Sequence, residues 1–389
     1  MKNLDKIIAG IILLITVIIY NAQNVPNRIE INRLEIIQVI GLDEEEEDKC
    51  TVSVVRNKES QGESDNEISE DDSFVERKIL NAEEITFEKA LRKVELQTDT
   101  KFSRGHIEYL IFGEKTAKNG IANMFDYLAR EEHIRLNSKV YICKDISSKE
   151  FLEKSMNSNY TMPNKLQSLE ESSELNNISQ NARVIDVIDT IIKKDAICLI
   201  PILKLDSEGK TSDIHIDGLA ILKGDSIIGV LNEKQTLNYN FLTNKVKIAD
   251  IIVKDEFDKT VSLQVINSKT KMDFEFEKEK LKKVKISIDV DSNYEEVHSL
   301  KDIFTTEYIN QIENKKAEYI KKEIEELIKY SKDLNVDLFD IGEKFKLRHP
   351  YKFRNIEKDW NNIYSGTDIE VNVQARIMGT YEVTKLTNL

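Results

Sequence analysis

The feature that most constrains this chain is a short, uncharged apolar segment near its N-terminus, over residues 7–20. Ten of its fourteen side chains are Ile, Leu or Val, and on an insertion scale these favour the bilayer by roughly 5 kcal/mol. A helix of this length reaches only about 21 Å, less than the hydrocarbon core of about 30 Å. The segment therefore predicts the core of an export signal or a thin single-pass anchor. We expect its membrane-facing residues to include Ile7, Ile11, Leu14 and Ile18.

The flanks of this segment favour an anchor over a cleaved signal. Lys2 and Lys6 precede it, as basic residues precede an export signal. No small-residue pattern suited to cleavage follows, because the bulky Tyr20 stands two residues before Ala22. A buried core helix is the alternative, but a helix that is apolar all round needs burial on every side. We therefore expect residues 1–23 to be a signal or anchor segment and the rest of the chain to be extracytoplasmic.

Beyond this segment the chain has the composition of a soluble protein. Its 389 residues are 40% hydrophobic and 32% charged, which suffices for two or three domains with a sizeable core. The formal net charge of −14 opposes binding to nucleic acid through charge alone. Cys50, Cys143 and Cys198 lie in or beside strand-like stretches and are expected to be small buried side chains; one disulfide outside the cytoplasm is the alternative, and it would leave a spare thiol. No Cys or His spacing typical of a zinc site occurs.

Apolar periodicity predicts an α/β domain over residues 24–195. Strands within 29–42 and over 51–56 are expected to form a hairpin around a charged turn at 44–48. The acid-rich stretch 57–73 is expected to be a disordered loop. The remaining predicted elements of this domain are helices over 86–96, 121–130 and 184–192, strands over 107–112 and 140–143, and a polar linker over 155–182.

Strand patterns dominate residues 196–268, where we predict a small, mostly antiparallel middle domain. Pro201 interrupts its first strand, which suits an edge position or the start of a strand. Residues 269–389 add a long helix over 299–334 to further strands, and helices packed on one face of a sheet define an α+β unit. The predicted fold class is therefore α+β, with three mixed units. The strands predicted beyond residue 195 cover 198–205, 214–222, 227–231, 246–253, 261–265, 272–276, 284–290 and 369–383, and a shorter helix covers 338–348.

No constellation with catalytic chemistry can be identified in the sequence. It lacks the nucleophile motif GxSxG, a phosphate-binding glycine loop and the zinc motif HExxH. The five histidines are scattered singly, and His106 and His133 are more typical of solvated pairs with nearby carboxylates than of sites. Trp360 is expected to be a packing anchor. We therefore predict no enzyme activity, no metal and no cofactor.

Short blocks in a fixed order give the chain a family resemblance. They are residues 30–34 (EINRL), 40–43 (IGLD), 105–106 (GH), 111–114 (IFGE), 135–137 (RLN), 218–220 (GLA), 242–246 (LTNKV), 342–343 (GE) and 359–360 (DW). Each block alone is weak, but the collinear set from residue 29 to 381 resembles the Ger(x)C family, the C subunits of spore nutrient germinant receptors.

The resemblance implies a three-domain α+β ectodomain on the outer surface of the spore inner membrane. It also implies no enzyme activity and association with two polytopic membrane subunits, A and B. The family normally carries a lipobox cysteine before a Trp-Asp pair, and residues 20–28 (YNAQNVPNR) contain neither. We therefore expect the apolar segment itself to hold the chain in the membrane, since a single acyl chain binds only marginally.

Three polar residues amid apolar sequence, Arg33, Arg135 and Asn137, are the candidate partner contacts. A structural salt bridge or helix cap would require the same residue types, so both interpretations stay open. The leading hypothesis is a membrane-anchored, non-enzymatic receptor subunit required for nutrient-triggered spore germination. The alternative is a free-standing extracytoplasmic protein that binds a small ligand between its domains. An exported hydrolase is a third hypothesis, for which no nucleophile or base can be named.

Overall fold

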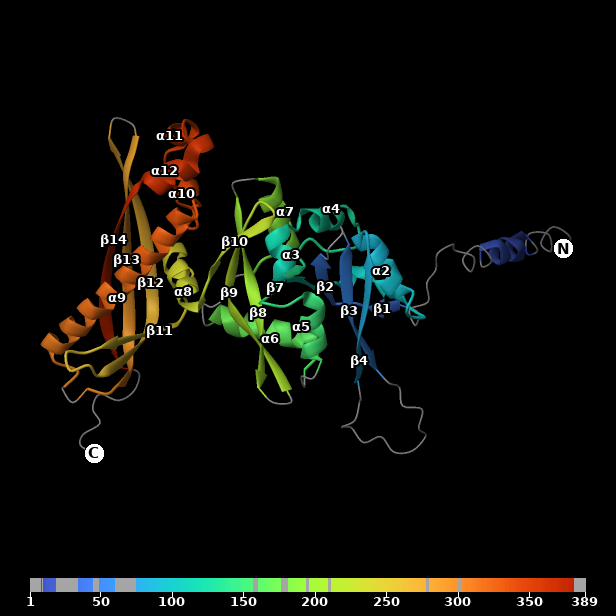
Figure 1. Cartoon of the computed structure of the whole chain (residues 1–389), viewed down its shortest axis with the longest axis horizontal. Helices are drawn as coiled ribbons and strands as arrows, with labels where there is room; N and C mark the ends of the chain where they lie inside the picture. The colour runs from blue at the N-terminus through green and yellow to red at the C-terminus, as the bar shows by residue number, and fades with distance from the viewer. Residues whose placement is uncertain are drawn as a thin grey trace.

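Two β-sheets carry the two halves of the chain, as Figure 1 shows. The computed structural model describes residues 8, 10–18, 34–44, 49–59, 75–156, 160–175, 181–193, 196–208, 211–277, 280–299 and 302–380. Among these residues, the first sheet has eight strands and the second has four. A separate parallel pair consists of β1 (Leu34–Ile36) and β5 (Lys101–Ser103).

The first sheet has parallel strands at its centre and antiparallel strands at both sides. In spatial order its strands are β10 (Ser226–Leu231), β9 (Thr211–Lys223), β8 (Ile197–Glu208), β7 (Lys139–Cys143), β6 (Tyr109–Gly113), β2 (Val39–Glu44), β3 (Cys50–Glu59) and β4 (Val75–Glu84). The neighbours from β8 to β2 pair in parallel. Every residue of β6 is buried, as expected for a central parallel strand whose two faces are covered.

Helices cover both faces of the first sheet. One face shares a core with Phe87, Phe125 and Val187, and the opposite face packs against Phe151 and Leu166. The helices of this unit are α2 (Phe87–Glu95), η2 (Arg104–His106), α3 (Glu114–Asn119), α4 (Ala122–Arg130), α5 (Ser148–Ser155), α6 (Met162–Leu175) and α7 (Val184–Ile192). The first sheet is therefore the middle layer of a three-layer unit.

The second sheet has one apolar face and one polar face. In spatial order its strands are β11 (Ala249–Lys254), β12 (Thr260–Glu277), β13 (Lys280–Val297) and β14 (Asp368–Thr380). Val284, Ile286 and Ile288 alternate with more exposed residues along β13, and Ile320 and Ile324 of the long helix lie in the same core. The helices of this unit are α8 (Glu233–Thr243), α9 (Thr306–Asp333), α10 (Ile341–Arg348), α11 (Pro350–Arg354), η3 (Glu357–Asp359) and α12 (Trp360–Gly366).

Most elements predicted from periodicity are present in the described chain. Strands β2 and β3 form the expected antiparallel hairpin, and the predicted helices over 86–96, 121–130 and 184–192 correspond to α2, α4 and α7. All three cysteines are buried, as expected. The long helix begins later than predicted, at Thr306, because the side chain of Thr305 caps it. Residues 45–48 of the charged turn and 60–74 of the acid-rich stretch lie outside the described residues.

The structure does not reproduce the small middle domain expected over residues 196–268. Strands β8, β9 and β10 extend the first sheet, whereas β11 and β12 belong to the second sheet. The predicted strands 261–265 and 272–276 are parts of one strand, β12, which shifts register between Val265 and Asn267. An alternating pattern shows that a segment is a strand but does not show which strand it pairs with, so the boundary was placed wrongly.

Two further predictions, the polar linker before β8 and the position of Pro201, are wrong. Residues 162–175, expected to be part of a polar linker, form α6, which Glu170 attaches to the first sheet through a hydrogen bond from Tyr141 and an ion pair with Lys139. Pro201 marks neither an edge nor the start of a strand, since β8 lies between β7 and β9 and begins at Ile197. The register of β8 with β9 shifts between Pro201 and Leu203, and such an irregularity accommodates a residue without an amide proton.

Candidate functional site

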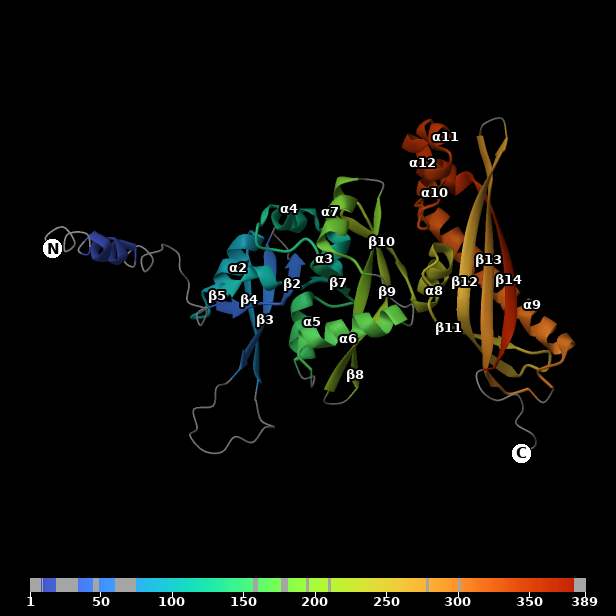
Figure 2. The ribbon, with the colours of Figure 1, turned by 180° about the vertical axis from the view of Figure 1, so that it is seen from behind.

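Three chain segments meet at the amino ends of the parallel strands of the first sheet. Residues 34–38 precede β2, 101–108 precede β6, and 131–138 precede β7, and these three strands are neighbours. We call these segments the amino-end rim. Parallel strands bring their amino ends to the same sheet edge, so the rim gathers residues that lie about a hundred positions apart in the sequence. Figure 2 shows β5 and α2 on the side of the first unit that is nearest the N-terminal helix.

Hydrogen bonds tie the three rim segments to one another. The carbonyl of Gln38 accepts from the amides of Glu108 at 2.9 Å and Tyr109 at 3.0 Å. The carbonyl of Glu108 accepts from the amide of Lys139 at 2.7 Å. Ser138 donates its hydroxyl to the carbonyl of Ile107 at 2.6 Å. The rim is therefore a connected surface rather than three independent loops.

A half-buried ionic cluster supports the rim from below. Arg104 donates to Glu88 at 2.9 Å and to Glu131 at 3.3 Å, and Tyr127 donates to the same two carboxylates at 2.5 and 2.9 Å. Burial by itself raises the pKa of Glu88, but hydrogen bonds from Tyr127, Arg92 and Arg104 outweigh it and hold that pKa below its ordinary value. The cluster is thus a charged network that fixes α2 and α4 to the rim.

Beside this cluster the rim carries a groove of about 1200 Å³. Its lining combines the apolar side chains Leu34 and Leu96 with Lys101, Arg104 and Glu131. A groove that mixes apolar and charged side chains in this way is not the mostly apolar pocket that captures a small apolar ligand.

The structure places two of the three predicted contact residues on the rim. Arg135 and Asn137 are exposed on the turn before β7, and neither side chain makes a hydrogen bond or ion pair with another described residue. The turn itself is fixed, since Ser138 donates its amide to the carbonyl of Arg135 at 3.0 Å. Within the described chain these side chains therefore serve neither as caps nor as salt bridges. Arg33 lies outside the described residues, immediately before β1.

Two of the short blocks that carry the family resemblance, residues 40–43 and 111–114, have structural roles. Asp43, which is 3% exposed, accepts from the amide and hydroxyl of Ser148, both at 2.8 Å, and so caps α5. A Cβ at Gly113 would lie 2.3 Å from Asp43 Oδ1, and one at Gly41 would lie 2.7 Å from Ser148 Oγ. These glycines are required because the backbone approaches the capped helix closely.

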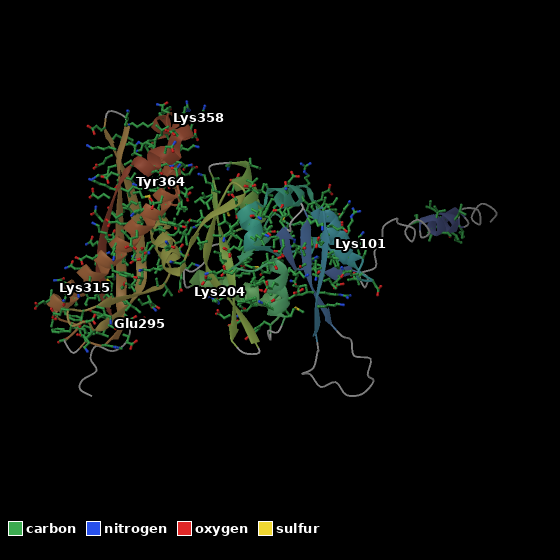
Figure 3. All side chains as sticks on the ribbon, viewed as in Figure 1. Lys101, Lys204, Glu295, Lys315, Lys358 and Tyr364 are labelled. Carbon is green, nitrogen blue, oxygen red and sulfur yellow. The ribbon has the colours of Figure 1, made fainter. Side chains whose placement is uncertain are left out.

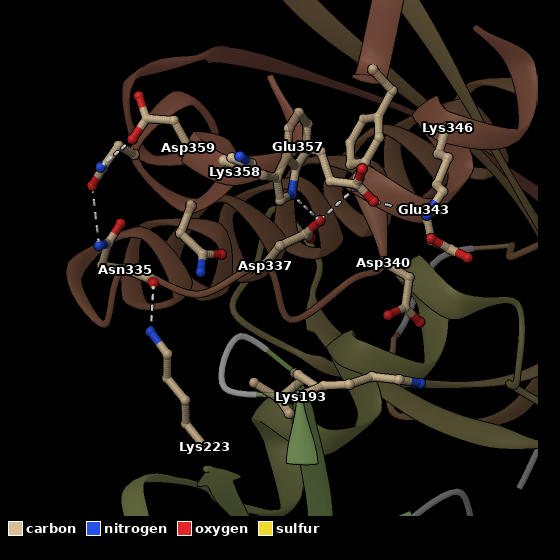
Figure 4. A pocket seen from close by; sticks show the side chains of 17 residues that line it. Lys193, Lys223, Asn335, Asp337, Asp340, Glu343, Lys346, Glu357, Lys358 and Asp359 are labelled. Atoms are coloured by element: carbon tan, nitrogen blue, oxygen red, sulfur yellow. Dashed lines mark hydrogen bonds and ion pairs between the residues drawn. The ribbon is translucent and has the colours of Figure 1, made fainter. Parts of the chain in front are cut away.

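A second candidate site is the cleft between the two units, drawn in Figure 4. It has a volume of about 520 Å³ and is lined by Lys193 and Lys223 from the first unit and by Asp337, Glu343 and other residues from the second. Lys223 donates across the cleft to the carbonyl of Asn335 at 3.4 Å.

Asp337 and Trp360 form the wall of this cleft that belongs to the second unit. Asp337 Oδ2 accepts from Trp360 Nε1 at 2.9 Å and from the amide of Gly342 at 2.6 Å. The tryptophan ring also packs against Phe345 and Phe353, which confirms the prediction that it is a packing anchor. Burial raises the pKa of Asp337 despite these hydrogen bonds. Asp337 and Trp360 therefore hold α10 against α12, which is a structural role.

Neither a metal-binding cluster nor a membrane-spanning helix occurs among the described residues. In that part of the chain, no group of three or more His, Cys, Asp or Glu side chains is placed to hold a metal ion. Residues 10–18 are helical, and Ile11, Leu14 and Ile18 are each at least half exposed, while Ile7 lies outside the described residues. No helix in the described ranges has both the length and the apolar character needed to cross a membrane.

Comparisons with known proteins give a consistent result over most of the chain. Residues 27–205 match the family described as "Spore germination protein N-terminal domain", and residues 217–381 match "Spore germination B3/ GerAC like, C-terminal". Spore germination protein B3 of Bacillus subtilis (strain 168) is 20% identical over 285 residues, which are 72% of this chain and 75% of that protein.

A solved structure has a similar fold. The crystal structure of the GerBC protein superposes with a TM-score of 0.58 at 16% sequence identity, and the match covers 87% of this chain and 96% of that one. At this identity the likeness concerns the fold. The gap between the two matched families, residues 206–216, falls in the hairpin of β8 and β9, within the first sheet.

Proposed function

Because this chain belongs to the Ger(x)C family of spore germination proteins, we propose that it is a membrane-anchored, non-enzymatic C subunit of a nutrient germinant receptor. In this role it assembles with the A and B membrane subunits at the spore inner membrane, with the bulk of the chain on the extracytoplasmic side, and is required for germination in response to nutrients. The observation that carries the proposal is the position of Arg135 and Asn137. They are exposed on the same rim where the apolar N-terminal segment joins the first unit.

Exposure of the N-terminal helix supports anchoring. Leu13 is 69% and Leu14 61% exposed, and every described residue from 8 to 18 is exposed to solvent. Leaving such a surface in water is unfavourable by roughly 25 cal/mol per Å² of apolar area. A bilayer or the membrane-embedded part of a partner removes this cost. The residues on either side of this helix include the apolar Ile7 and Ile19.

Satisfied polar clusters support a non-enzymatic role. Arg104 forms ion pairs with both Glu88 and Glu131, and the carboxylates of Asp43 and Asp337 accept hydrogen bonds from helix amides. A catalytic acid or base needs a pKa adjusted to its task and access to a substrate. These groups instead hold elements together.

The proposal is tested by co-purification of the full chain from detergent-solubilised spore membranes. We expect the A and B subunits to accompany the wild-type chain, and we expect Arg135→Glu to reduce their recovery about tenfold, as loss of one good charged contact does. Arg354→Glu is the matched control, because Arg354 is also exposed but lies on α11 in the second unit. Equal recovery with both variants, or a wild-type chain that purifies alone, contradicts the proposal.

The alternative function, capture of a small ligand, has one observation in its favour. The cleft between the units presents lysines and carboxylates together, including Lys193, Lys346 and Asp340, which suits a zwitterionic ligand such as an amino acid. Isothermal titration of the full chain in detergent with nutrient amino acids tests it. Saturable binding that Lys193→Glu abolishes, in a chain recovered without membrane subunits, favours this alternative.

A further inference from the structure

The parallel pair β1 and β5 has one covered face and one open face. Leu34 pairs with Lys101 and Glu35 pairs with Phe102, so alternate side chains point to opposite sides. Phe102 is 6% exposed, and the side chain of Glu35 is 12% exposed. Leu34, Ile36 and Lys101 therefore occupy the open face, where Ile36 is 59% exposed.

A third apolar side chain extends this open face. Leu96, which follows the last residue of α2, lines the same groove as Leu34 and Lys101. It is 84% exposed, more than any other large apolar side chain in the described part of the chain. Arg92 of the same helix is also exposed beside it and lines the groove. We call Leu34, Ile36, Leu96 and Lys101 the apolar knob.

We propose that the apolar knob rests in the headgroup region of the lipid bilayer that holds the N-terminal segment. This inference depends on the proposed function, since it requires that segment to be embedded. The helix over residues 10–18 is joined to β1 by residues 19–33. A connection of this length spans about 50 Å at most. The knob begins where the connection ends, so it is the part of the folded chain held nearest to the bilayer.

The size of the knob favours a lipid surface over a protein partner. A stable protein interface buries about 800 Å² on each side in a complementary shape, and three aliphatic side chains cannot supply such an area. A bilayer needs no complementary shape. It accepts protruding Leu and Ile side chains at the acyl boundary, while Lys and Arg reach the anionic headgroups.

Because the inserted N-terminal segment already holds the chain at the membrane, a weak contact between the apolar knob and the lipid is sufficient. A few exposed apolar residues bind a bilayer poorly when the protein is free in solution. Once the N-terminal segment is inserted, the second contact becomes intramolecular, and its effective concentration rises to the millimolar range. The knob then sets the orientation of the ectodomain. Figure 3 labels Lys101 on the side of the folded chain nearest the N-terminal helix, and Lys315 of the second unit on the far side, so the second unit points away from the lipid.

The inference is tested with an environment-sensitive NBD label on the full chain. Leu96→Cys accepts the label at the knob, and Leu347→Cys is the control, because Leu347 on α10 is 78% exposed but belongs to the second unit. The three native cysteines are buried and are therefore poor targets for labelling. The chain is reconstituted in phosphatidylcholine–phosphatidylglycerol vesicles that contain brominated acyl chains, and flotation reports whether it is bound.

We expect the bromolipids to quench the label at position 96 several-fold more than the label at position 347, and we expect Ile36→Asp in the same chain to reduce that difference. A chain that floats with the vesicles but shows equal quenching at both positions overturns the knob contact and leaves anchoring intact. Protection of position 96 from aqueous iodide without bromolipid quenching overturns it in favour of a protein contact. A chain that does not float overturns anchoring, and this inference with it.

Discussion

Asp43 and Lys316 are buried charged residues that join elements distant in the sequence. Asp43 connects β2 to the N-terminus of α5. Lys316 of α9 is fully buried and donates to Ser292 Oγ at 2.8 Å and to the carbonyls of Val290 and Arg376 at 3.2 Å, so it links the helix to two strands. At this scale most buried charges in the described chain have a structural role, and the residues left for recognition are exposed ones such as Arg135.

Lys316 predicts a pH dependence of stability. Burial lowers its pKa to about 8, although the nearby carboxylates Glu313 and Asp291 oppose the shift. Between pH 8 and 10.5, Lys316 is protonated in most unfolded molecules but deprotonated in most folded ones. The free energy of unfolding therefore rises with pH across this range, by roughly 3 kcal/mol in total. Urea unfolding of the wild type and of Lys316→Met across this range measures the difference. Parallel pH profiles of the two proteins contradict the prediction.

Gly41 predicts a steric effect close to the Asp43 cap. A methyl group there meets Ser148 Oγ at 2.7 Å and Leu152 Cδ1 at 2.8 Å, and both are held by packing. We expect Gly41→Ala to destabilise the chain by about 1–3 kcal/mol. Gly366→Ala is the matched control, since nothing lies within 4 Å of its added Cβ. Equal midpoints of thermal unfolding for the two variants would show that the site can relax.

At the scale of elements, α6 shows how one buried side chain attaches a helix that the sequence pattern does not reveal. Its residues MPNKLQSLEESSEL are mainly polar, and only a few of them, such as Leu166, reach the core. Glu170 is 6% exposed and accepts from Tyr141 at 2.5 Å. Lys139 pairs with the same carboxylate. The helix therefore depends on this polar contact as much as on its apolar face.

Removal of Glu170 should release α6 without unfolding the first unit. Glu170→Ala removes the carboxylate that Tyr141 and Lys139 contact and costs roughly 2 kcal/mol. Hydrogen exchange should then accelerate over residues 162–175 and remain unchanged over α7. Glu171→Ala serves as the control, because Glu171 is exposed on the same helix. Uniform acceleration across the whole first unit would instead mean that α6 is required for the fold.

At the scale of the molecule, the two units share a core rather than meeting at a loose hinge. Leu199 and Leu231 of the first sheet lie in the same buried cluster as Phe241 of α8 and Leu327 of α9. Tyr330 of α9 accepts from the amide of Val230 at 3.1 Å and donates to its carbonyl at 3.2 Å, so it satisfies part of the outer edge of β10. The second unit therefore caps the first sheet.

This shared core predicts coupled unfolding. We expect calorimetry of the wild-type chain to show one main transition, and we expect Tyr330→Phe to lower its midpoint or to split it, since the change removes two hydrogen bonds worth about 1 kcal/mol each. Tyr351→Phe is the control, because Tyr351 is 82% exposed on α11. Two well-separated transitions in the wild type would show that the units are independent.

Local patterns in the sequence determined most elements and the family of this chain. Alternation along β13 and helical spacing in α9 reflect which side chains face the core, and both patterns depend only on residues that are close together in the sequence. The same applies to the buried cysteines and to the apolar N-terminal segment. Family blocks such as IGLD could be recognised for the same reason, since each is a short contiguous run.

Pairing and proximity were decided only by the tertiary structure. The pattern of β8 does not state that it pairs with β7, because strand partners are chosen by long-range packing and register. Likewise, no local signal places Arg135 on the same rim as β1 or shows that Glu170 accepts a hydrogen bond from Tyr141. The sequence therefore identified Arg135 and Asn137 as candidate contacts, and the parallel order of β2, β6 and β7 decided that they share a rim with the segment that enters from the membrane anchor we propose.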